Sequence, residues 1–286
     1  MEVYNPLNLA ELTACLPLFK PGAIISGGCT DLSVRYLKAS LPGQLLNVSL
    51  VSELRKINTE AGYLRIGAAA TFTELEEYAA PAGFEALKQM AAGVGSKQIR
   101  NAATVGGNIM NASPAGDLAP CLFLLGAGIE FMKPNGSVCC RSIEETVTGA
   151  GKTSLEYNEV LTAVKIPIPN TNGWHTAFLK LGFRKNVTAA RINIAVSARA
   201  VGGNADEARF YMGAVAPVPV RIYEAEKILL ENEWNAKTCD KLAAYLSDWL
   251  KRTVPAEFDR DYKAYAIKGA VYDLLRMFPF FKGAVS

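Results

Sequence analysis

Two stretches of the sequence combine paired glycines with hydroxyl and carboxyl side chains, and both could hold a phosphate. The first is IISGGCTDL at residues 24–32, and the second is NAATVGGNIMNASPAGD at residues 101–117. Glycine lets a backbone approach a ligand closely, and exposed N–H groups at such turns bind anions, phosphates above all. The presence of two such turns is better explained by a ligand with two phosphates than by two unrelated turns.

Polar side chains near the second glycine pair could supply further partners for a nucleotide. Thr104, Asn108 and Asn111 offer hydroxyl and amide groups, and Asp117 accepts hydrogen bonds of the kind that a ribose hydroxyl donates. Each stretch also has an ordinary interpretation, in which Asp31 or Asp117 caps the helix that follows a turn. The joint occurrence of two glycine pairs favours the binding site.

Other motifs argue against two common nucleotide sites and against a metal centre. Neither stretch is G-x-G-x-x-G or G-x-x-x-x-G-K-[ST], which disfavours a nicotinamide Rossmann site and a P-loop. The six cysteines form no C-x-x-C pair, so we expect reduced thiols and no zinc or iron–sulfur site built within the chain. These cysteines are Cys15, Cys29, Cys121, Cys139, Cys140 and Cys239.

The first half of the chain is expected to alternate strands and helices, as in an α/β unit. Thr73 is expected to cap one helix, and Asp117 is expected to cap another that has Pro120 in its first turn. The expected elements are a helix over 7–19, a strand over 23–26, a helix over 32–39, a strand over 44–49, a strand and helix over 63–80, a helix over 81–95, a helix over 117–127 and a hairpin over 128–141.

The second half is expected to have strands followed by helices, which indicates an α+β unit distinct from the first. Strands are expected over 160–169, 176–183, 191–201 and 208–215, and helices over 220–232, 236–250 and 261–277. The Pro, Asn and Gly residues of 168–174 predict a boundary there. We therefore expect a domain over 1–170, with subdomains of about 1–57 and 58–170, and a second domain over 171–286.

Composition and charge exclude several classes of partner. Lys plus Arg number 30 and Asp plus Glu number 27. This excess of positive charge is too small and too scattered to indicate nucleic-acid binding. No segment has the roughly 18 uninterrupted apolar residues of a membrane span, and the N-terminus does not look like a signal peptide. We expect a cytoplasmic protein without nucleic-acid or membrane partners.

The sequence resembles the FAD-binding subunits of the molybdenum hydroxylases, the xanthine dehydrogenase family with its carbon monoxide, nicotinate and aldehyde dehydrogenase relatives. The similar segments are GGCTDL, IGAAATFTELE, VGSKQIRNAATVGGNIMNASPAGDLAPCLFLLGA and AFLKLGFRKNVTAARINIAV, in order from about residue 24 to residue 199. The resemblance implies an α+β fold: the FAD-binding (PCMH-type) domain shared with vanillyl-alcohol oxidase, made of two α/β subdomains, followed by a C-terminal antiparallel sheet with helices.

The resemblance also implies which residues contact FAD. Asp117 would take ribose or adenosine hydroxyls, Leu161 would meet the adenine end or the ring wall, and Val94 and Lys180 would lie near the cofactor. The first pyrophosphate loop would consist of Ile24, Ile25, Ser26, Gly27, Gly28, Cys29, Thr30 and Asp31. The second would consist of Ala103, Thr104, Val105, Gly106, Gly107 and Asn108. Cys29 is a departure, because many relatives have glycine there and a positive φ would strain it.

The function implied by the resemblance is electron relay. A large partner with a molybdenum cofactor would hydroxylate the substrate, and a small partner with two [2Fe–2S] clusters would pass electrons to the FAD of this chain. FAD would deliver electron pairs to NAD⁺ or another acceptor. This chain would supply no catalytic residue and no metal ligand. The motifs look most like those of xanthine dehydrogenase relatives, and the expected assembly is a dimer of heterotrimers.

Two other functions stay open from the residues alone. The chain could be a self-contained FAD-dependent oxidase or dehydrogenase of the same fold, or a nucleotide-binding module without redox chemistry. His175, the single histidine, is expected to be structural, so FAD would be bound noncovalently. Four basic side chains have two possible roles: they could contact the cofactor or a partner, or they could simply lie on the surface. These are Lys97, Arg100, Arg184 and Lys185.

Overall fold

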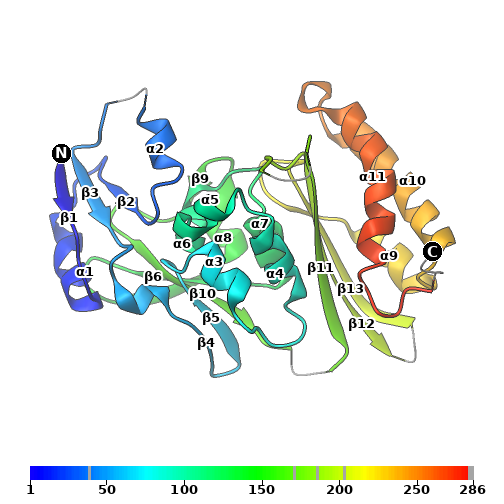
Figure 1. Ribbon diagram of the computed structural model, residues 1–286, viewed down its shortest axis with the longest axis horizontal. Helices are drawn as coiled ribbons and strands as arrows, with labels where there is room; N and C mark the ends of the chain where they lie inside the picture. Colours follow the sequence, from blue (N-terminus) through cyan, green and yellow to red (C-terminus); the bar gives the residue numbers. More distant parts are fainter. Residues whose placement is uncertain (38–39, 170–171, 185–186, 202–203, 283–286) are drawn as a thin grey trace. The chain divides into compact units, whose positions relative to one another are not determined.

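The computed structural model describes residues 1–37, 40–169, 172–184, 187–201 and 204–282. The chain forms two compact units (Figure 1). Unit 1 consists of Met1–Tyr78, Val94–Ser113 and Leu125–Ile168, and unit 2 of Ala79–Gly93, Pro114–Leu124 and Pro169–Ser286. The predicted boundary between residues 170 and 171 lies outside the described residues. Within those residues, no helix combines the length and the apolar character that a bilayer crossing needs.

Unit 1 begins with a three-stranded parallel sheet of strand order β1-β3-β2, formed by Glu2–Tyr4, Gln44–Asn47 and Ile24–Ser26. The helix α1 (Leu9–Cys15) continues into the 3₁₀ turn η1 (Leu16–Leu18), and a further 3₁₀ turn, η2, covers Ser52–Arg55. Apolar residues of these elements, including Leu12, Leu16 and Leu46, form one buried cluster. Burial of this cluster holds the sheet on which the first glycine pair is mounted.

The larger sheet of unit 1 is antiparallel with strand order β4-β5-β10-β6-β7. Its strands are Ile57–Glu60, Tyr63–Gly67, Val160–Pro167, Gly128–Met132 and Val138–Ser142. The predicted hairpin over 128–141 is confirmed as β6 and β7. The helices of unit 1 are α2 (Leu32–Arg35), α3 (Phe72–Glu77), α5 (Lys97–Ala102), α6 (Val105–Asn111) and α8 (Ile143–Thr146), and a small hairpin joins β8 (Val147–Gly149) to β9 (Lys152–Thr153).

Two predictions for unit 1 are wrong. Thr71 rather than Thr73 caps α3, because the Thr71 hydroxyl accepts from the Glu74 amide while the Glu74 carboxylate accepts from the Thr71 amide. The second glycine pair lies in the first turn of the helix α6 rather than in a loop. Glycine has low helix propensity, which is why the local sequence favours a loop.

Unit 2 is built on an antiparallel sheet of strand order β11-β12-β13-β14. Its strands are Trp174–Leu181, Ile192–Val201, Asn204–Gly213 and Val220–Arg221. One face packs against α9 (Tyr223–Glu231), α10 (Ala236–Thr253) and α11 (Arg260–Leu275), with a 3₁₀ turn η3 at Ala256–Phe258; α4 (Glu85–Ala92) and α7 (Leu118–Leu124) lie on the other side of the sheet (Figure 1). The strands predicted over 176–183, 191–201 and 208–215 are confirmed as β11, β12 and β13, and the three predicted helices as α9, α10 and α11. The strand predicted over 160–169 is β10 of unit 1, and residues 220–221, predicted as helix, form β14.

The helix α4 belongs to unit 2 although it comes from the first half of the chain, and its side chains complete an edge of the sheet. Glu85 Oε2 accepts from the Thr176 amide at 3.0 Å, and Gln89 Oε1 accepts from the Phe178 amide at 2.7 Å. Both amides belong to β11, one of the two edge strands of this sheet. An edge strand with unpaired amides invites association with other chains, so α4 protects this edge.

Candidate functional site

The first glycine pair follows β2 and leads into α2 through residues 27–31. Ser26 at the end of the strand is buried, and its hydroxyl lies 2.7 Å from the thiol of Cys29. Cys29 has a φ of 56°, in the left-handed region that favours glycine. Within the described part of the chain, the backbone N–H groups of residues 28–31 donate to no acceptor. These four amides are therefore free to donate to a ligand.

The amides at the second glycine pair are already used by the protein. Those of Val105 and Gly106 donate to the carbonyls of Ala70 and Ala68 at 2.9 and 2.8 Å. The Gly107 amide donates to Oγ1 of Thr104 at 3.2 Å, and the following amide donates to the Thr104 carbonyl. The expectation that both glycine pairs offer free amides therefore holds for the first pair and not for the second.

The first glycine pair packs closely against residues 102–104, just before the second pair, because it has no side chains. A Cβ on Gly27 would stand 2.3 Å from Oγ1 of Thr104, and a Cβ on Gly28 would stand 1.6 Å from the carbonyl oxygen of Ala102. Any larger residue at position 28 would force the backbones apart. The packing of the two segments on each other thus requires glycine at these positions.

A cavity of about 370 Å³ opens beside the paired segments, within unit 1. Its volume is in the range typical of ligand sites. The cavity brings together most of the residues predicted to bind the cofactor. Those on its wall are Ile24, Ile25, Ser26, Gly27, Gly28, Cys29, Thr30, Asp31, Ala103, Thr104, Gly106, Gly107, Asn108 and Leu161.

Four predicted residues do not line this cavity. Val105 is fully buried in the first turn of α6, and Val94 is half-buried in the turn before α5. Asp117 and Lys180 belong to unit 2, whereas the cavity lies in unit 1. Their predicted contact with the cofactor stays a prediction.

Asp117 and Lys180 form a buried ion pair of their own. Lys180 Nζ lies 2.6 Å from Asp117 Oδ2 and also donates to the Gly93 carbonyl at 2.9 Å. Asn193 Nδ2 donates to Asp117 Oδ1 at 3.2 Å, while Asn193 Oδ1 has no partner within the described residues. Burial raises the pKa of the Asp117 carboxyl, against the opposing effect of the Lys180 charge and of both hydrogen bonds.

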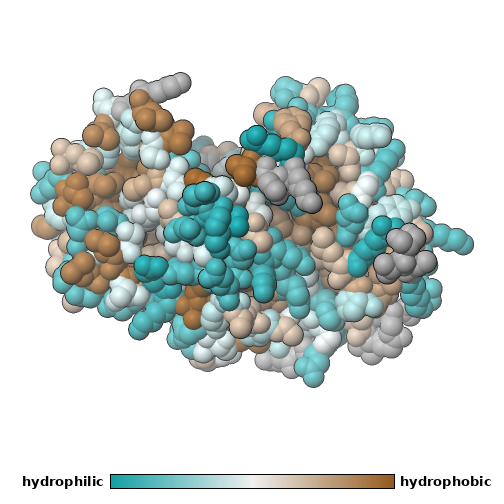
Figure 2. All heavy atoms as spheres, viewed as in Figure 1, coloured by the Kyte–Doolittle hydropathy of each residue, from teal (hydrophilic) through white to brown (hydrophobic). Residues whose placement is uncertain are grey.

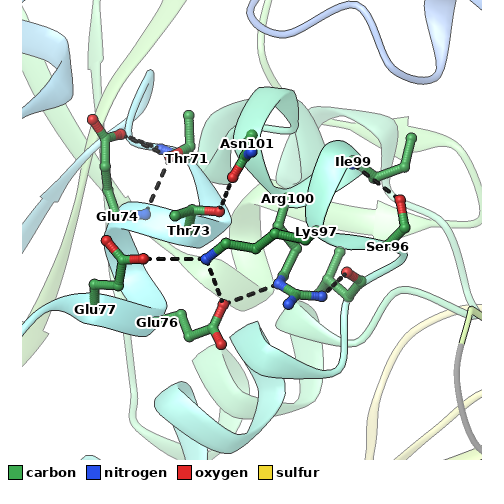
Figure 3. Close-up of polar contacts among 11 residues, drawn as sticks. Thr71, Thr73, Glu74, Glu76, Glu77, Ser96, Lys97, Ile99, Arg100 and Asn101 are labelled. Atoms are coloured by element: carbon green, nitrogen blue, oxygen red, sulfur yellow. Dashed lines mark hydrogen bonds and ion pairs between the residues drawn. The ribbon is translucent and has the colours of Figure 1, made fainter.

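Lys97 and Arg100 are both paired with acids, as Figure 3 shows. Lys97 Nζ lies 3.1 Å from Glu77 Oε1, and Arg100 Nε donates to Glu76 Oε2 at 3.0 Å. Arg100 also donates to the Val94 carbonyl at 3.3 Å. A hydrophilic patch covers α3 and α5 in Figure 2. These contacts give both side chains a role in holding α5 to α3.

The remaining candidates lie in unit 2 or outside the described residues. His175 is in β11, and its ring packs against Phe280 with the ring centroids 6.1 Å apart. Arg184 donates to the Val187 carbonyl at 3.0 Å, and Lys185 lies outside the described residues. Within those residues, no group of three His, Cys, Asp or Glu side chains could hold a metal ion.

The cavity also contains residues that the sequence interpretation did not select. Arg35 is the one basic residue on its wall within the described part of the chain, and Glu156, Tyr157 and Glu159 line it from the segment before β10. Asn111, weighed earlier as a nucleotide partner, lies on the wall as well. The spacing of Arg35 four residues after Asp31 was the available signal, because residues so spaced face each other on a helix.

The composition of the wall fits one end of a dinucleotide that carries phosphates. Free amides of residues 28–31 and the Thr104 hydroxyl can donate to phosphate oxygens. Ile24, Ile25 and Leu161 supply apolar surface for a ring or a ribose edge. The arrangement binds and orients a ligand, and no nucleophile with an adjacent general base lies among the wall residues.

Comparison with known proteins identifies the family. Residues 1–169 match the FAD binding domain in molybdopterin dehydrogenase, and residues 177–277 match the CO dehydrogenase flavoprotein C-terminal domain. The xanthine dehydrogenase FAD-binding subunit of Escherichia coli O157:H7 is 34% identical over 226 residues, covering 78% of this chain and 77% of that protein. The nicotinate dehydrogenase FAD-subunit of Eubacterium barkeri is 28% identical over 276 residues, covering 94% and 92%. Reconstituted CO dehydrogenase from Oligotropha carboxidovorans has a chain that superposes with a TM-score of 0.84 at 25% identity, covering 97% of both chains.

An FAD-binding α+β protein is the class that the fold and these matches define. The chain belongs to the FAD-binding subunits of the molybdenum hydroxylases, the xanthine dehydrogenase family. It is therefore an oxidoreductase subunit with FAD as its cofactor. The fold implied by the resemblance, with its C-terminal antiparallel sheet and helices, is confirmed.

Proposed function

We propose that this chain holds FAD noncovalently in the cavity of unit 1 and relays electrons within a xanthine dehydrogenase-like molybdenum hydroxylase. The observation that carries the proposal is the set of free amides at residues 28–31 on the wall of a cavity in a family that binds FAD. These amides would donate to the diphosphate, and the Thr104 hydroxyl would add a donor from the second segment. When bound, FAD accepts single electrons and gives up a hydride.

For the predicted residues outside the cavity, the proposed contacts with FAD rest on the family resemblance. Asp117 would accept from ribose or adenosine hydroxyls, and Val94 and Lys180 would lie near the cofactor. Noncovalent binding is supported by His175, the single histidine, which packs against Phe280 in unit 2. The chain's own residues would bind and orient the cofactor, and none would carry out the hydroxylation.

The partners belong to the same proposal. Electrons would enter from [2Fe–2S] clusters of a small subunit, which receives them from a molybdopterin-binding large subunit, and would leave to NAD⁺ or another acceptor. The matching xanthine dehydrogenase subunit at 34% identity supports a purine as the substrate of the whole enzyme. A dimer of heterotrimers in the cytoplasm is the assembly that we propose. Domains over 1–170 and 171–286 are proposed likewise.

The test is to purify the full chain and to examine its colour and its reactions. A yellow protein with absorption near ~450 nm shows the flavin. Reduction by NADH, with no turnover of purines or aldehydes by the chain alone, supports the relay. Turnover of an organic substrate without partner subunits would instead favour a self-contained oxidase or dehydrogenase. A colourless protein that binds ADP but no flavin would refute the proposal and favour a nucleotide-binding module.

A further inference from the structure

Arg35 lies on the cavity wall in a network that joins the two glycine-bearing segments. Its guanidinium Nη2 lies 2.9 Å from Asp31 Oδ2 and donates to Asn111 Oδ1 at 3.1 Å. Asn111 Nδ2 in turn donates to Asp31 Oδ1 at 3.5 Å. Asp31 closes the first segment and Asn111 ends α6, so this triad bridges them at the cavity.

The charges on the cavity wall are unbalanced for an anionic ligand. Within the described residues, the wall has three acidic residues, Asp31, Glu156 and Glu159, and one basic residue, Arg35. Arg141 Nη1 lies 3.3 Å from the buried Glu159 carboxylate and neutralises it. A diphosphate carries two negative charges, and among the wall residues that the structure describes Arg35 is the one cation that can meet them.

The pairing of Arg35 with Asp31 is weak enough to be exchanged. The two side chains are 55% and 52% exposed, and ion pairs so exposed contribute little net stability because water screens them. A guanidinium prefers phosphate oxygens, which it can bind through two parallel hydrogen bonds. Asn111 holds the guanidinium at the cavity when Asp31 is released, because its contact does not depend on charge.

We propose that Arg35 is a cofactor-binding residue that exchanges Asp31 for the diphosphate of FAD. This inference rests on the proposed function of the same cavity. In the free chain the Asp31 carboxylate is paired with the Arg35 guanidinium. In the complex, phosphate oxygens of FAD replace that carboxylate. Asp31 therefore competes with the diphosphate for Arg35, rather than acting mainly as a ligand group for FAD.

The test is titration of the flavin-free full chain with FAD and with ADP at several salt concentrations. Arg35→Gln should raise the Kd for both ligands about tenfold, the effect expected of one charge-assisted hydrogen-bond pair. It should also flatten the dependence of Kd on salt, because one ion contact is lost. Adenosine, which has no phosphate, should bind equally to wild type and variant. Asp31→Asn should lower the Kd for FAD about threefold, because Arg35 is then free.

A matched control is Arg55→Gln, which removes the same charge from unit 1. Arg55 is 51% exposed and pairs with Glu74, and it is not on the cavity wall. Its Kd for FAD should equal that of wild type. The inference would be overturned if Arg35→Gln bound FAD and ADP as tightly as wild type does. It would also be overturned if Asp31→Asn bound FAD more weakly than wild type. Failure of wild type to bind FAD would instead refute the proposed function.

Discussion

Lys180 Nζ lies 2.6 Å from Asp117 Oδ2, so two residues predicted to contact the cofactor are partners of each other in unit 2. Their side chains are only 13% and 8% exposed. A buried pair of this kind is costly to break, because the remaining buried charge loses its counter-ion. The pair therefore supports the structure of unit 2, whatever its role toward FAD.

Lys180→Met should destabilise the protein by about 3 kcal/mol at pH 7, because it leaves the Asp117 carboxylate buried and unpaired. The wild-type pKa of Asp117 is already raised by burial, so protonation of Asp117 favours the folded state and this contribution is lost as pH rises. In the variant that pKa rises further, and the deficit should be greatest near pH 7 and should shrink as pH falls. Urea unfolding between pH 5 and pH 8 measures this trend.

The control for this prediction is Lys282→Met, because Lys282 pairs with Glu233 at 3.0 Å with both side chains more than half exposed. Its effect should stay within about 0.5 kcal/mol. Adding Asp117→Asn to Lys180→Met should recover part of the lost stability. A Lys180→Met deficit that grows toward acid pH would contradict this account of the pair.

Cys29 provides a chemical probe of the first glycine-bearing segment, the proposed site of the diphosphate. Its side chain is exposed and lies on the cavity wall, whereas the exposed thiol of Cys140 lies on β7, away from that wall. FAD at ten times its Kd should slow alkylation of Cys29 about tenfold, because the occupied fraction of the site is protected. The rate at Cys140 should not change. Mass spectrometry of both peptides checks this, and equal rates at Cys29 with and without FAD would place the cofactor elsewhere.

Gly28→Ala should unfold the first segment or displace it from α5. The added Cβ would stand 1.6 Å from the Ala102 carbonyl oxygen, and a backbone atom cannot yield by a rotamer change. We expect a loss of about 3 kcal/mol or more, together with loss of FAD from the purified protein. Gly43→Ala is the matched substitution, because a Cβ there meets no atom within 4 Å. Its Tm should remain that of wild type, and a wild-type Tm for Gly28→Ala would refute the close packing.

Glu130 should account for part of the acid sensitivity of unit 1. Burial works to raise the pKa of its carboxyl, but contacts from Lys165, Thr162 and Arg65 outweigh burial and lower that pKa below 4.5. A lowered pKa stabilises the fold above pH 4.5, and this contribution is lost as pH falls through the folded-state value. Glu130→Gln should cost about 2 kcal/mol at pH 7 and progressively less below pH 4.5.

The comparison for Glu130 is Glu60→Gln, which removes an exposed acid 3.5 Å from the same arginine, Arg65. In urea unfolding, Glu60→Gln should change the free energy of unfolding by less than about 0.5 kcal/mol at any pH. A pH-independent effect of Glu130→Gln would show that its carboxylate adds nothing beyond packing.

The sequence predicted the elements that local chemistry determines. The turn residues of the hairpin over 128–141 and the apolar periodicity of α9 and α10 are local signals, and these elements are confirmed. The cap of α3 was misplaced although Thr71 and Glu74 have the spacing of a capping box. The capping-box spacing predicts the cap at Thr71, two residues before Thr73.

The rest depends on contacts between distant residues. The helix α6 forms despite its glycines because Ala68 and Ala70 accept from its first amides. Arg35 meets Asn111 across 76 positions of sequence, and Asp117 meets Lys180 across 63. No local pattern specifies such pairs, so the sequence indicated the two glycine-bearing segments of the cavity wall but not the cation beside them.

The chain passes between unit 1 and unit 2 five times, after residues 78, 93, 113, 124 and 168. As the ribosome extends the polypeptide, α4 and α7 emerge long before the strands β11, β12 and β13 that they cover. Their apolar faces therefore remain without packing partners in the nascent chain until those strands leave the exit tunnel. A fragment cut at residue 170 would separate α4 and α7 from the strands that they cover, so we expect apolar surface to be exposed on both halves.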